Sequence, residues 1–385
     1  MQFKSVSRNI NSLFLNFLSL LFLFFLFLAV NVSAQINNNA FIFEAKSDSI
    51  HQTKWKIDFQ SLSYFQNREY FGQIADGYTL FGNLVAPKII YKPSSKVSIE
   101  AGAFIKKDFG NDGIKEIQPI FTILIEKDST KFRFGNLNGN LNHQLIEPLY
   151  SFEGIISNNL ESGIQLTKIK NGNFFDFWVD WQRMIYQKSP FKEEIWGGVN
   201  WKPVVYKKNN FQFKIPIQFT AYHKGGQITI DNRPLKTEIN LAIGTETSWQ
   251  KDGFFERITL QNYLLAFKEQ SNVIKEYKSG MALYLNATFE NKKFNTMFSY
   301  FYGNSFNSFA GGDLYQSINK NESSNTEQYR KLLIVRLYKD ICIIPNLYLV
   351  ARFEPYYDLV NKQFEHSEGL FISYKEQFGL GRKTK

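Results

Sequence analysis

The sequence predicts an all-β protein, a transmembrane antiparallel up-and-down β-barrel of about 16 strands that follows an N-terminal signal peptide. Three observations predict it: long segments in which apolar and polar residues alternate, connections whose lengths alternate, and 17% aromatic residues among 385. A period of two places the apolar side chains on one face of a strand. A soluble antiparallel sheet alternates too, but ordinary strands average about 5–6 residues, whereas a tilted membrane strand needs about 9–11. Most segments here belong to the longer class.

The N-terminal segment predicts export. Lys4 and Arg8 precede an apolar run from Leu13 to Val30, and Val-Ser-Ala follows where a small-residue cleavage site is expected. The run is also long enough for an uncleaved anchor, since a membrane helix needs about 20 apolar residues. That alternative would leave a soluble β-protein held by its N-terminal helix. We favour three parts: a signal peptide at 1–34, a periplasmic N-terminal leader at 35–52 and an outer-membrane β-barrel at 53–385.

The strand predictions follow the alternating segments in chain order. We expect strands at 53–65, 77–91, 97–106, 115–126, 131–136, 158–169, 174–186, 193–206, 211–223, 236–249, 254–268, 276–289, 294–303, 329–339, 347–355 and 367–380. In segment 238–249, for example, Ile239, Leu241 and Ile243 share one face, and acidic and amide residues share the other. Pro203 and Pro216 fall within expected strands, where a proline removes a ladder donor, so we expect bulges or strand ends there.

The connections between these strands alternate in length. The short connections are 92–96, 127–130, 170–173, 207–210, 250–253 and 290–293, and the long ones are 66–76, 137–157, 224–235, 304–328 and 356–366. Bacterial outer-membrane barrels have short periplasmic turns and longer extracellular loops. Backbone groups in lipid must all be paired, so an open sheet edge is not tolerated there. The pattern therefore predicts a closed barrel in the outer membrane of a Gram-negative bacterium.

Composition excludes several other classes. The net charge is +10 and the pI is about 9.3, but Lys and Arg are scattered along the chain and no nucleic-acid motif occurs, so we expect no nucleic-acid partner. Cys342 is the single cysteine, which excludes an intrachain disulfide and a cysteine metal cluster. The four histidines show no metal-ligand spacing, and no Gly-x-Ser-x-Gly or His-Glu-x-x-His motif is present. We therefore predict no cofactor, no metal site and no enzymatic activity.

Two stretches carry a family resemblance. The segment "IKKDFGNDG" (105–113), and "FGNLNGNLNHQLIEPLYSFEGIISNNLESGIQL" (134–166) followed by "FDFWVDWQRMIY" (175–186), resemble a family of porin-like outer-membrane β-barrel proteins of the Bacteroidota. The "SAQ" at the end of the expected signal peptide resembles that group as well. The resemblance implies location and architecture, and it implies no particular substrate.

Loop 137–157 is the third long connection and contains the main candidate site. In general porins the third long loop folds into the barrel and narrows it. A possible constriction loop here would use His143, Gln144, Glu147, Tyr150 and Glu153. The alternative is an extracellular loop whose apolar residues Leu145, Ile146, Pro148 and Leu149 pack on the barrel rim. His143 beside Glu147 could belong to a catalytic site, but an isolated loop histidine is usually solvated.

Charged residues on the polar strand faces are the expected pore lining. Charges inside a membrane barrel must face water or pair with one another, so they set selectivity by default. The candidates are Lys106, Arg133, Asp176, Asp180, Lys214, Glu238, Glu246, Arg257, Glu290, Arg352 and Glu354, with Arg183 and Arg336 dependent on register. Cross-strand ion pairs that stiffen the wall are the alternative role. The mixture of signs argues against strong ion selectivity.

Two functions are consistent with these observations. The first is a porin-like outer-membrane channel for passive diffusion of small polar solutes, with outer-membrane lipid and those solutes as partners. The alternative is a structural or assembly component of the outer membrane, with a closed barrel and partner-binding extracellular loops, especially 304–328. A homo-oligomer is compatible with either function, since trimers are common among 16-stranded porins, but no interface pattern demands one.

Overall fold

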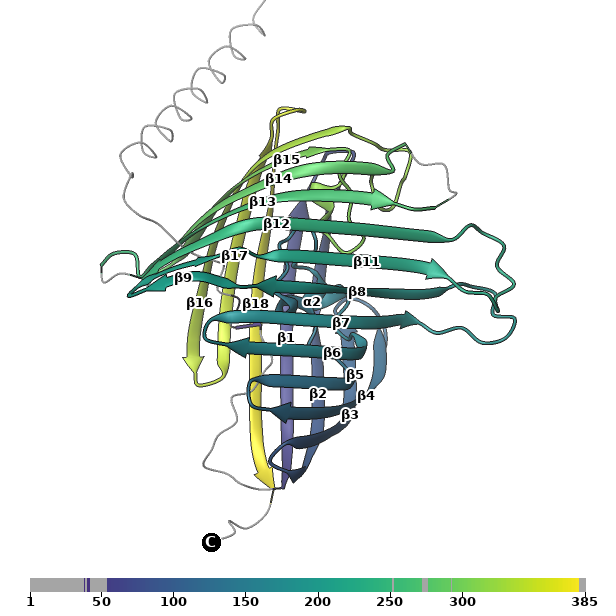
Figure 1. The fold of residues 1–385 in the computed structure, drawn as a ribbon, viewed down its shortest axis with the longest axis vertical. Helices are drawn as coiled ribbons and strands as arrows, with labels where there is room; N and C mark the ends of the chain where they lie inside the picture. The colour runs from purple at the N-terminus through teal and green to yellow at the C-terminus, as the bar shows by residue number, and fades with distance from the viewer. Residues whose placement is uncertain are drawn as a thin grey trace, which may run out of the picture.

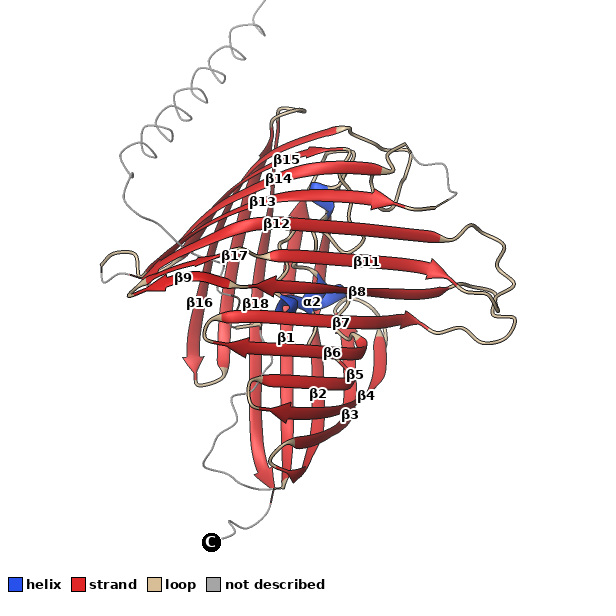
Figure 2. Cartoon of the chain, viewed as in Figure 1, coloured by secondary structure: helices blue, strands red, loops and turns tan. Residues whose placement is uncertain are grey.

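The computed structural model describes residues 38, 40–41, 54–250, 253–271, 276–291 and 293–380. The predicted signal peptide and most of the leader lie outside these residues. Almost every described segment is a strand, and helix is confined to short pieces inside the barrel (Figures 1 and 2). Among the described residues, no helix is long and apolar enough to cross a membrane.

The strands form one closed antiparallel sheet. The bounds are β1 Trp55–Glu69, β2 Tyr78–Ser94, β3 Val97–Asp108, β4 Glu116–Lys127, β5 Thr130–Asn136, β6 Ser162–Lys170, β7 Asn173–Arg183, β8 Glu193–Lys202, β9 Val204–Lys208, β10 Phe211–Lys214, β11 Ile217–Gly225, β12 Lys236–Gln250, β13 Arg257–Glu269, β14 Ser279–Glu290, β15 Asn295–Asn304, β16 Tyr329–Ile344, β17 Leu347–Asp358 and β18 Gln363–Leu380. Strand β1 pairs with both β2 and β18, which closes the ring.

The eighteen segments make sixteen crossings of the wall, as predicted. Pro203 separates β8 from β9, and Ile215 and Pro216 separate β10 from β11. Each pair continues one course, because β8 pairs with β11 and β9 pairs with β10. The prolines therefore interrupt the ladder without ending the crossing, since a proline lacks the N–H that the ladder requires.

Several strand boundaries differ from the sequence prediction. The expected strand 158–169 begins only at Ser162, and 174–186 ends at Arg183. Other strands are longer than predicted: β1 continues to Glu69, β16 to Ile344, and β18 starts at Gln363. Polar residues occupy both faces at the added end of β1, so alternation fades there, whereas the added end of β16 is mostly apolar.

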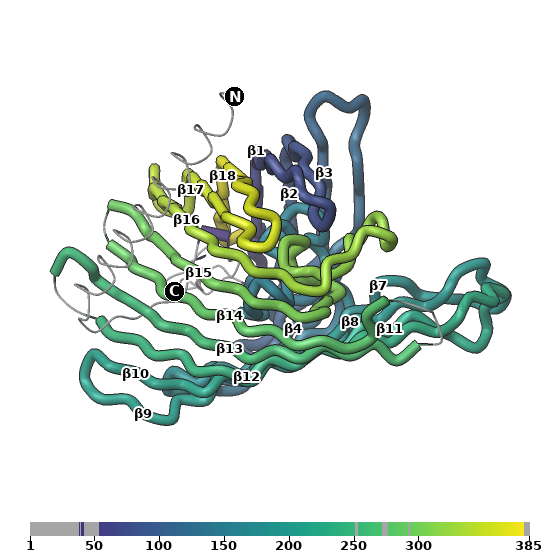
Figure 3. Tube along the Cα trace, turned by 90° about the horizontal axis from the view of Figure 1, so that it is seen from above, coloured from purple at the N-terminus to yellow at the C-terminus, as the bar shows by residue number. Residues whose placement is uncertain are grey.

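The tight turns all lie on one rim, which we call the short-turn rim. Asn171 and Gly172, between β6 and β7, have φ values of 53° and 82°. A two-residue hairpin with both φ values positive matches the twist of the flanking strands and favours Asn-Gly. The other rim, the long-loop rim, carries the connections 137–161 and 305–328, both of which turn back into the barrel, as the view from above illustrates (Figure 3).

The outer wall is apolar and the inner face is mixed. Outward residues such as Leu241, Leu264 and Met281 are exposed. The inner face carries buried polar residues together with three apolar clusters. The largest cluster joins inward residues of β12–β17 to residues of both inward loops, among them Ile146 and Phe306. Two residues of the predicted leader, Ala40 and Phe41, are buried in a second cluster on the inner side of β1–β4 and β18.

Candidate functional site

Loop 137–161 runs through the barrel interior. The backbone N–H of Ile146 donates to Gln218 Oε1 at 3.0 Å, and Asn200 Nδ2 donates to the carbonyl of His143 at 2.7 Å. These wall residues belong to β11 and β8, so the loop is hydrogen-bonded to the inner face of the barrel. The alternative of a loop packed on the outer rim is therefore wrong for this segment.

His143 binds one carboxylate of the wall and one of its own loop. Its Nδ1 lies 2.6 Å from Asp176 Oδ2 on β7, and its Nε2 lies 2.7 Å from Glu161 Oε2. The ring stacks on Trp178 with centroids 3.9 Å apart, and it is wholly buried. His143 belongs to the loop, not to a membrane-crossing strand. Burial alone would lower the pKa of His143, but Glu161 and Asp176 together outweigh burial and raise that pKa.

The backbone around His143 is shaped for this contact. Asn140 is the first residue of the short helix η1 (Asn140–His143), and Gln144 is the residue that follows it. Their φ values are 56° and 53°, in the left-handed region. Asparagine adopts that region more readily than most residues other than glycine. Gly139 leaves room for the carboxylate, because a Cβ there would lie 2.5 Å from the carboxyl carbon of Glu161. The expectation of a solvated His143 is wrong, since composition does not reveal that Asp176 of β7 and Glu161 at the far end of the loop converge on it.

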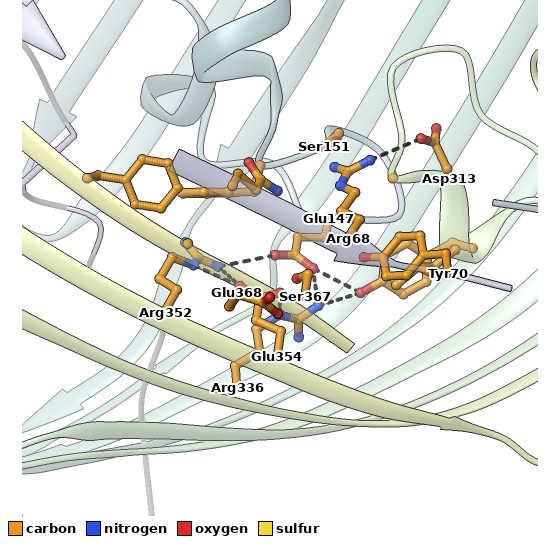
Figure 4. A pocket seen from close by; sticks show the side chains of 17 residues that line it. Arg68, Tyr70, Glu147, Ser151, Asp313, Arg336, Arg352, Glu354, Ser367 and Glu368 are labelled. Atoms are coloured by element: carbon orange, nitrogen blue, oxygen red, sulfur yellow. Dashed lines mark hydrogen bonds and ion pairs between the residues drawn. The ribbon is translucent and has the colours of Figure 1, made fainter. Parts of the chain in front are cut away.

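A second cluster joins the same loop to the opposite wall (Figure 4). Glu147 lies between Arg336 of β16 and Arg352 of β17, and it pairs with both. Glu354 accepts hydrogen bonds from Arg352 Nε at 2.7 Å and Arg336 Nε at 3.2 Å. Tyr315, in helix η2 (Asp313–Tyr315) of loop 305–328, donates to Glu147 Oε2 at 2.9 Å. Both inward loops are therefore tied to one arginine-carboxylate cluster.

Arg68 of β1 extends this cluster. Its Nη2 lies 2.7 Å from Glu153 Oε2, next to helix α2 (Gly154–Ser157), and its Nη1 lies 3.4 Å from Asp313 Oδ2. Tyr78 also donates to Glu153 at 2.7 Å. The space left between these groups measures about 50 Å³. A space of this size can hold water molecules but is too small for a substrate.

A larger cavity lies on the other side of loop 137–161, which we call the chamber. Its volume is about 410 Å³. Its walls are the ends of β1–β5 and β18 nearest the short-turn rim, and the loop segment 136–142 forms part of its lining. Lys88, Glu100 and Asp58 lie on its wall, and Lys88 Nζ is 3.0 Å from Glu100 and 3.2 Å from Asp58.

Two histidines face outward near the long-loop rim. His223 Nδ1 of β11 lies 2.9 Å from Thr237 Oγ1 of β12, and both residues share the outward face with Leu241. His366 Nδ1 of β18 lies 2.9 Å from Glu368 Oε2. The first pair therefore joins an imidazole to a hydroxyl, and the second joins an imidazole to a carboxylate.

A groove on the outer wall lies beside the first pair. It spans β12 to β15 near the long-loop rim and measures about 480 Å³. Ala266 lies between Leu241 and Met281 in register, so a small side chain is flanked by two large ones. Lys268 and Ser279 lie at the next outward positions, toward the rim. The groove is thus apolar along its length and polar at its upper end.

The predicted pore-lining residues share the inner face, and most are paired. Asp176 bonds to His143, and Glu246 pairs with Lys214 at 3.3 Å. Glu290 lies 3.7 Å from Arg257. The others on this face are Lys106, Arg133, Asp180, Glu238, Arg352, Glu354 and Arg336. Arg183 lies at a bulge at the end of β7, and its Nη1 is 3.8 Å from Glu194 Oε1. Their role in selectivity stays a prediction.

The loop candidates divide between the two clusters. Tyr150 and His143 contact Glu161, and Glu147 and Glu153 contact arginines. The Gln144 backbone carbonyl accepts a hydrogen bond from Asn200 at 2.9 Å. Sequence reasoning missed Glu161, because it was assigned to a strand, and the inward course of loop 305–328. Within the described ranges, no group of three or more His, Cys, Asp or Glu side chains is arranged to hold a metal ion.

Solved structures share the fold. One match is a loop L8 deletion mutant of OmpT, an outer membrane protein of Vibrio cholerae, with a TM-score of 0.51 and 9% identity over 84% of this chain and 100% of that one. A BenF-like porin from Pseudomonas fluorescens Pf-5 matches with a TM-score of 0.48 and 8% identity over 84% of this chain and 99% of that one. No curated protein matches the chain. The barrel prediction is confirmed.

A family model corrects the functional expectation. The family described as Lipid A 3'-O-deacylase-type matches residues 45–383. Deacylases are enzymes, so the prediction of no enzymatic activity is wrong. The matched family also differs from the porin-like family that segments 105–113, 134–166 and 175–186 resemble. The predicted outer-membrane barrel architecture holds, whereas the Bacteroidota origin stays a prediction. The fold and the family place the protein in the outer membrane of a Gram-negative bacterium, as predicted. The chain belongs to the Lipid A 3'-O-deacylase-type family.

Proposed function

We propose that this protein hydrolyses an ester-linked acyl chain of lipid A at the outer wall of its barrel. The observation that carries the proposal is the 2.9 Å contact between His223 Nδ1 and Thr237 Oγ1. A hydroxyl hydrogen-bonded to an imidazole is the minimal arrangement of a nucleophile and its general base. Both side chains face lipid near the long-loop rim, the extracellular side in barrels of this kind. A lipid substrate could reach them by lateral diffusion. The family description supports an O-linked acyl group as the substrate.

The proposed reaction is a two-step acyl transfer. His223 accepts the hydroxyl proton as Thr237 Oγ1 attacks the ester carbonyl carbon, and the lipid alkoxide leaves with the proton that His223 returns. The acyl chain is then bound to Thr237 as an ester. Water, deprotonated by the same imidazole, attacks that ester and releases a fatty acid, which restores the hydroxyl. The groove beside Leu241, Ala266 and Met281 supports the proposal by offering an apolar surface for the acyl chain.

Mass spectrometry of lipid A incubated with the purified protein in detergent tests this proposal. We expect the loss of one acyl chain per molecule. His223→Ala and Thr237→Val should each reduce the rate by about 100-fold or more, because general-base and nucleophilic groups contribute at that level. His366→Ala is the matched control, since it removes another outward histidine near the same rim and should leave the rate unchanged. Hydrolysis that persists in both site variants would place the chemistry elsewhere.

A second candidate function is passive diffusion of small polar solutes through the lumen. The observation that favours it is the chamber of about 410 Å³, lined by charged and amide side chains. Pore width and lining charges would set the preference among solutes. Loop 137–161 and the pair Glu147–Arg336 would form the constriction. The two functions are compatible, because one uses the outer wall and the other uses the lumen.

Liposome swelling with sugars and amino acids tests the channel. Solute uptake supports it, and deletion of residues 140–153 should raise single-channel conductance in a planar bilayer, because the deletion removes the segment that carries His143 and Glu147. Unchanged conductance would remove the constriction role. No uptake, together with a co-purifying partner, would instead support a structural component with a closed barrel.

A further inference from the structure

We infer that the chamber is a binding site for a neutral sugar. This inference goes beyond ester hydrolysis and does not depend on it, because the chamber lies inside the barrel and the His223–Thr237 pair lies outside. The chamber volume of about 410 Å³ falls in the range of about 300–1,000 Å³ that is usual for small-molecule sites. It therefore has room for a mono- or disaccharide.

The loop side of the chamber is rich in side-chain amides. Asn136, Asn138, Asn140 and Asn142 all line it. The amides of Asn136 and Asn140 are engaged within the protein, so Asn138 and Asn142 carry the inference. An amide both donates and accepts hydrogen bonds, as the hydroxyl groups of a sugar do. Simple anions and cations offer only one of these roles. Gln60 and Gln377 add two further amides from the wall, and the Nε2 atom of each donates to Asp58.

Asn138 is held in place while its side chain remains available. Its backbone N–H donates to Gln165 Oε1 at 2.9 Å, and its carbonyl accepts from Gln165 Nε2 at 3.0 Å. Among the described residues, its side-chain amide makes no hydrogen bond. Asn142 Nδ2 donates to the carbonyl of Gly139 at 2.9 Å, which fixes the orientation of its amide. A fixed backbone with an available amide is the preorganised arrangement that a polar ligand requires.

All three carboxylates of the chamber are paired with lysines of the chamber. Lys88 contacts both Glu100 and Asp58, and Lys131 Nζ lies 3.4 Å from Glu126 Oε1. The four basic and three acidic residues that line the chamber nearly cancel: Lys88, Lys92, Lys131 and Arg133 against Asp58, Glu100 and Glu126. An ionic ligand would have to break existing pairs, whereas a neutral polyhydroxyl ligand would not. The existing ion pairs therefore favour a neutral ligand over a charged one.

Isothermal titration of the full chain in detergent with sucrose tests the inference. We expect saturable binding that Asn138→Leu and Asn142→Leu each weaken at least tenfold. Asn232→Leu is the matched control, because it makes the same change on an exposed loop outside the chamber and should leave the affinity unchanged. Asn138→Gln, which keeps an amide, should retain more affinity than Asn138→Leu. Heat-modifiable gel migration shows that each variant is folded.

Three outcomes would overturn the inference. Absence of a binding heat with sucrose, glucose and raffinose would remove the sugar site. Equal affinity of wild type and both asparagine variants would move the site out of the chamber. Tighter binding of gluconate than of glucose would show an ionic site instead. Sucrose binding should be unchanged in His223→Ala, so the failure of ester hydrolysis and the failure of this inference are distinguishable.

Discussion

The two halves of the barrel interior differ, although the same alternation of residues builds both. On the side of β12–β17, aromatic and aliphatic side chains pack with Phe306 and Tyr315 of loop 305–328 into a continuous core. On the side of β1–β5 and β18, near the short-turn rim, the inner face surrounds the chamber. We call these the dry half and the wet half. The difference shows that the inner face of a membrane barrel can serve as a protein core where apolar loop side chains pack against it, and as the wall of a polar cavity where the loop leaves space unfilled.

The largest expected effect comes from His143, which secures the loop between the two halves. His143→Leu would leave Glu161 and Asp176 buried without their shared partner, and breaking a buried ion pair costs about 3–5 kcal/mol. The midpoint of thermal unfolding in detergent, followed by gel migration, measures the loss. His366→Leu is the control, because its partner Glu368 is exposed and such pairs contribute about 1 kcal/mol or less. Equal losses would show that the loop is not held by this contact.

A pair of truncations tests the distinction between dry and wet halves. Phe306→Ala removes a wholly buried ring from the dry half and should cost about 3–5 kcal/mol, because the surrounding core cannot collapse onto the space. Ile90→Ala on the chamber wall should cost less, about 2 kcal/mol, because this side chain borders the cavity and has fewer packing partners to lose. Denaturant unfolding of both variants measures the difference. If Ile90→Ala proved as costly as Phe306→Ala, the chamber would be packed like the other half.

The sequence predicts the wall well, and the reason is physical. Lipid requires an apolar outer face on every strand, so the period of two recurs sixteen times. Turns such as Asn171-Gly172 are recognisable from their residue types. Strand ends are less predictable, because neither lipid nor a core dictates their residues. The prolines 203 and 216 illustrate this: the sequence shows an interruption, and only the pairing shows that the crossing continues.

The interior is less predictable, because it depends on contacts between distant segments. His143 meets Asp176 of β7, 33 residues away, and Glu147 meets Arg336, 189 residues away. Such pairings leave no periodic signal. Loop 305–328 contains Phe306, Phe309 and Tyr315, an apolar content unusual for a solvated loop, and that was the one local sign of its inward course. The outward pair His223–Thr237 was equally hidden, because its two residues lie in different strands.

A smaller effect is expected at Gly139, which sets the distance between the loop and Glu161. A Cβ there would lie 2.5 Å from the Glu161 carboxyl carbon, so Gly139→Ala should displace that carboxylate and cost about 1–3 kcal/mol. Gly72→Ala is the control, since the nearest atom would lie at an ordinary 3.5 Å. Sucrose titration of the same variants would show whether the displacement also disturbs the neighbouring asparagines. A Gly139→Ala protein as stable as Gly72→Ala would contradict the close contact.

The smallest effect is expected on the outer wall, where two adjacent leucines of β13 give a direct comparison. Leu264 is 64% exposed and faces outward, whereas Leu265 is 1% exposed in the dry half. Leu265→Ala should cost about 2–5 kcal/mol. Leu264→Ala should cost about 0.5 kcal/mol or less, because lipid and detergent chains are as apolar as the leucine they replace. Denaturant unfolding of both variants measures the two losses in the free energy of unfolding. If Leu264→Ala were as costly as Leu265→Ala, this part of the wall would pack against another protein surface, and a homo-oligomer would be the first arrangement to test by light scattering.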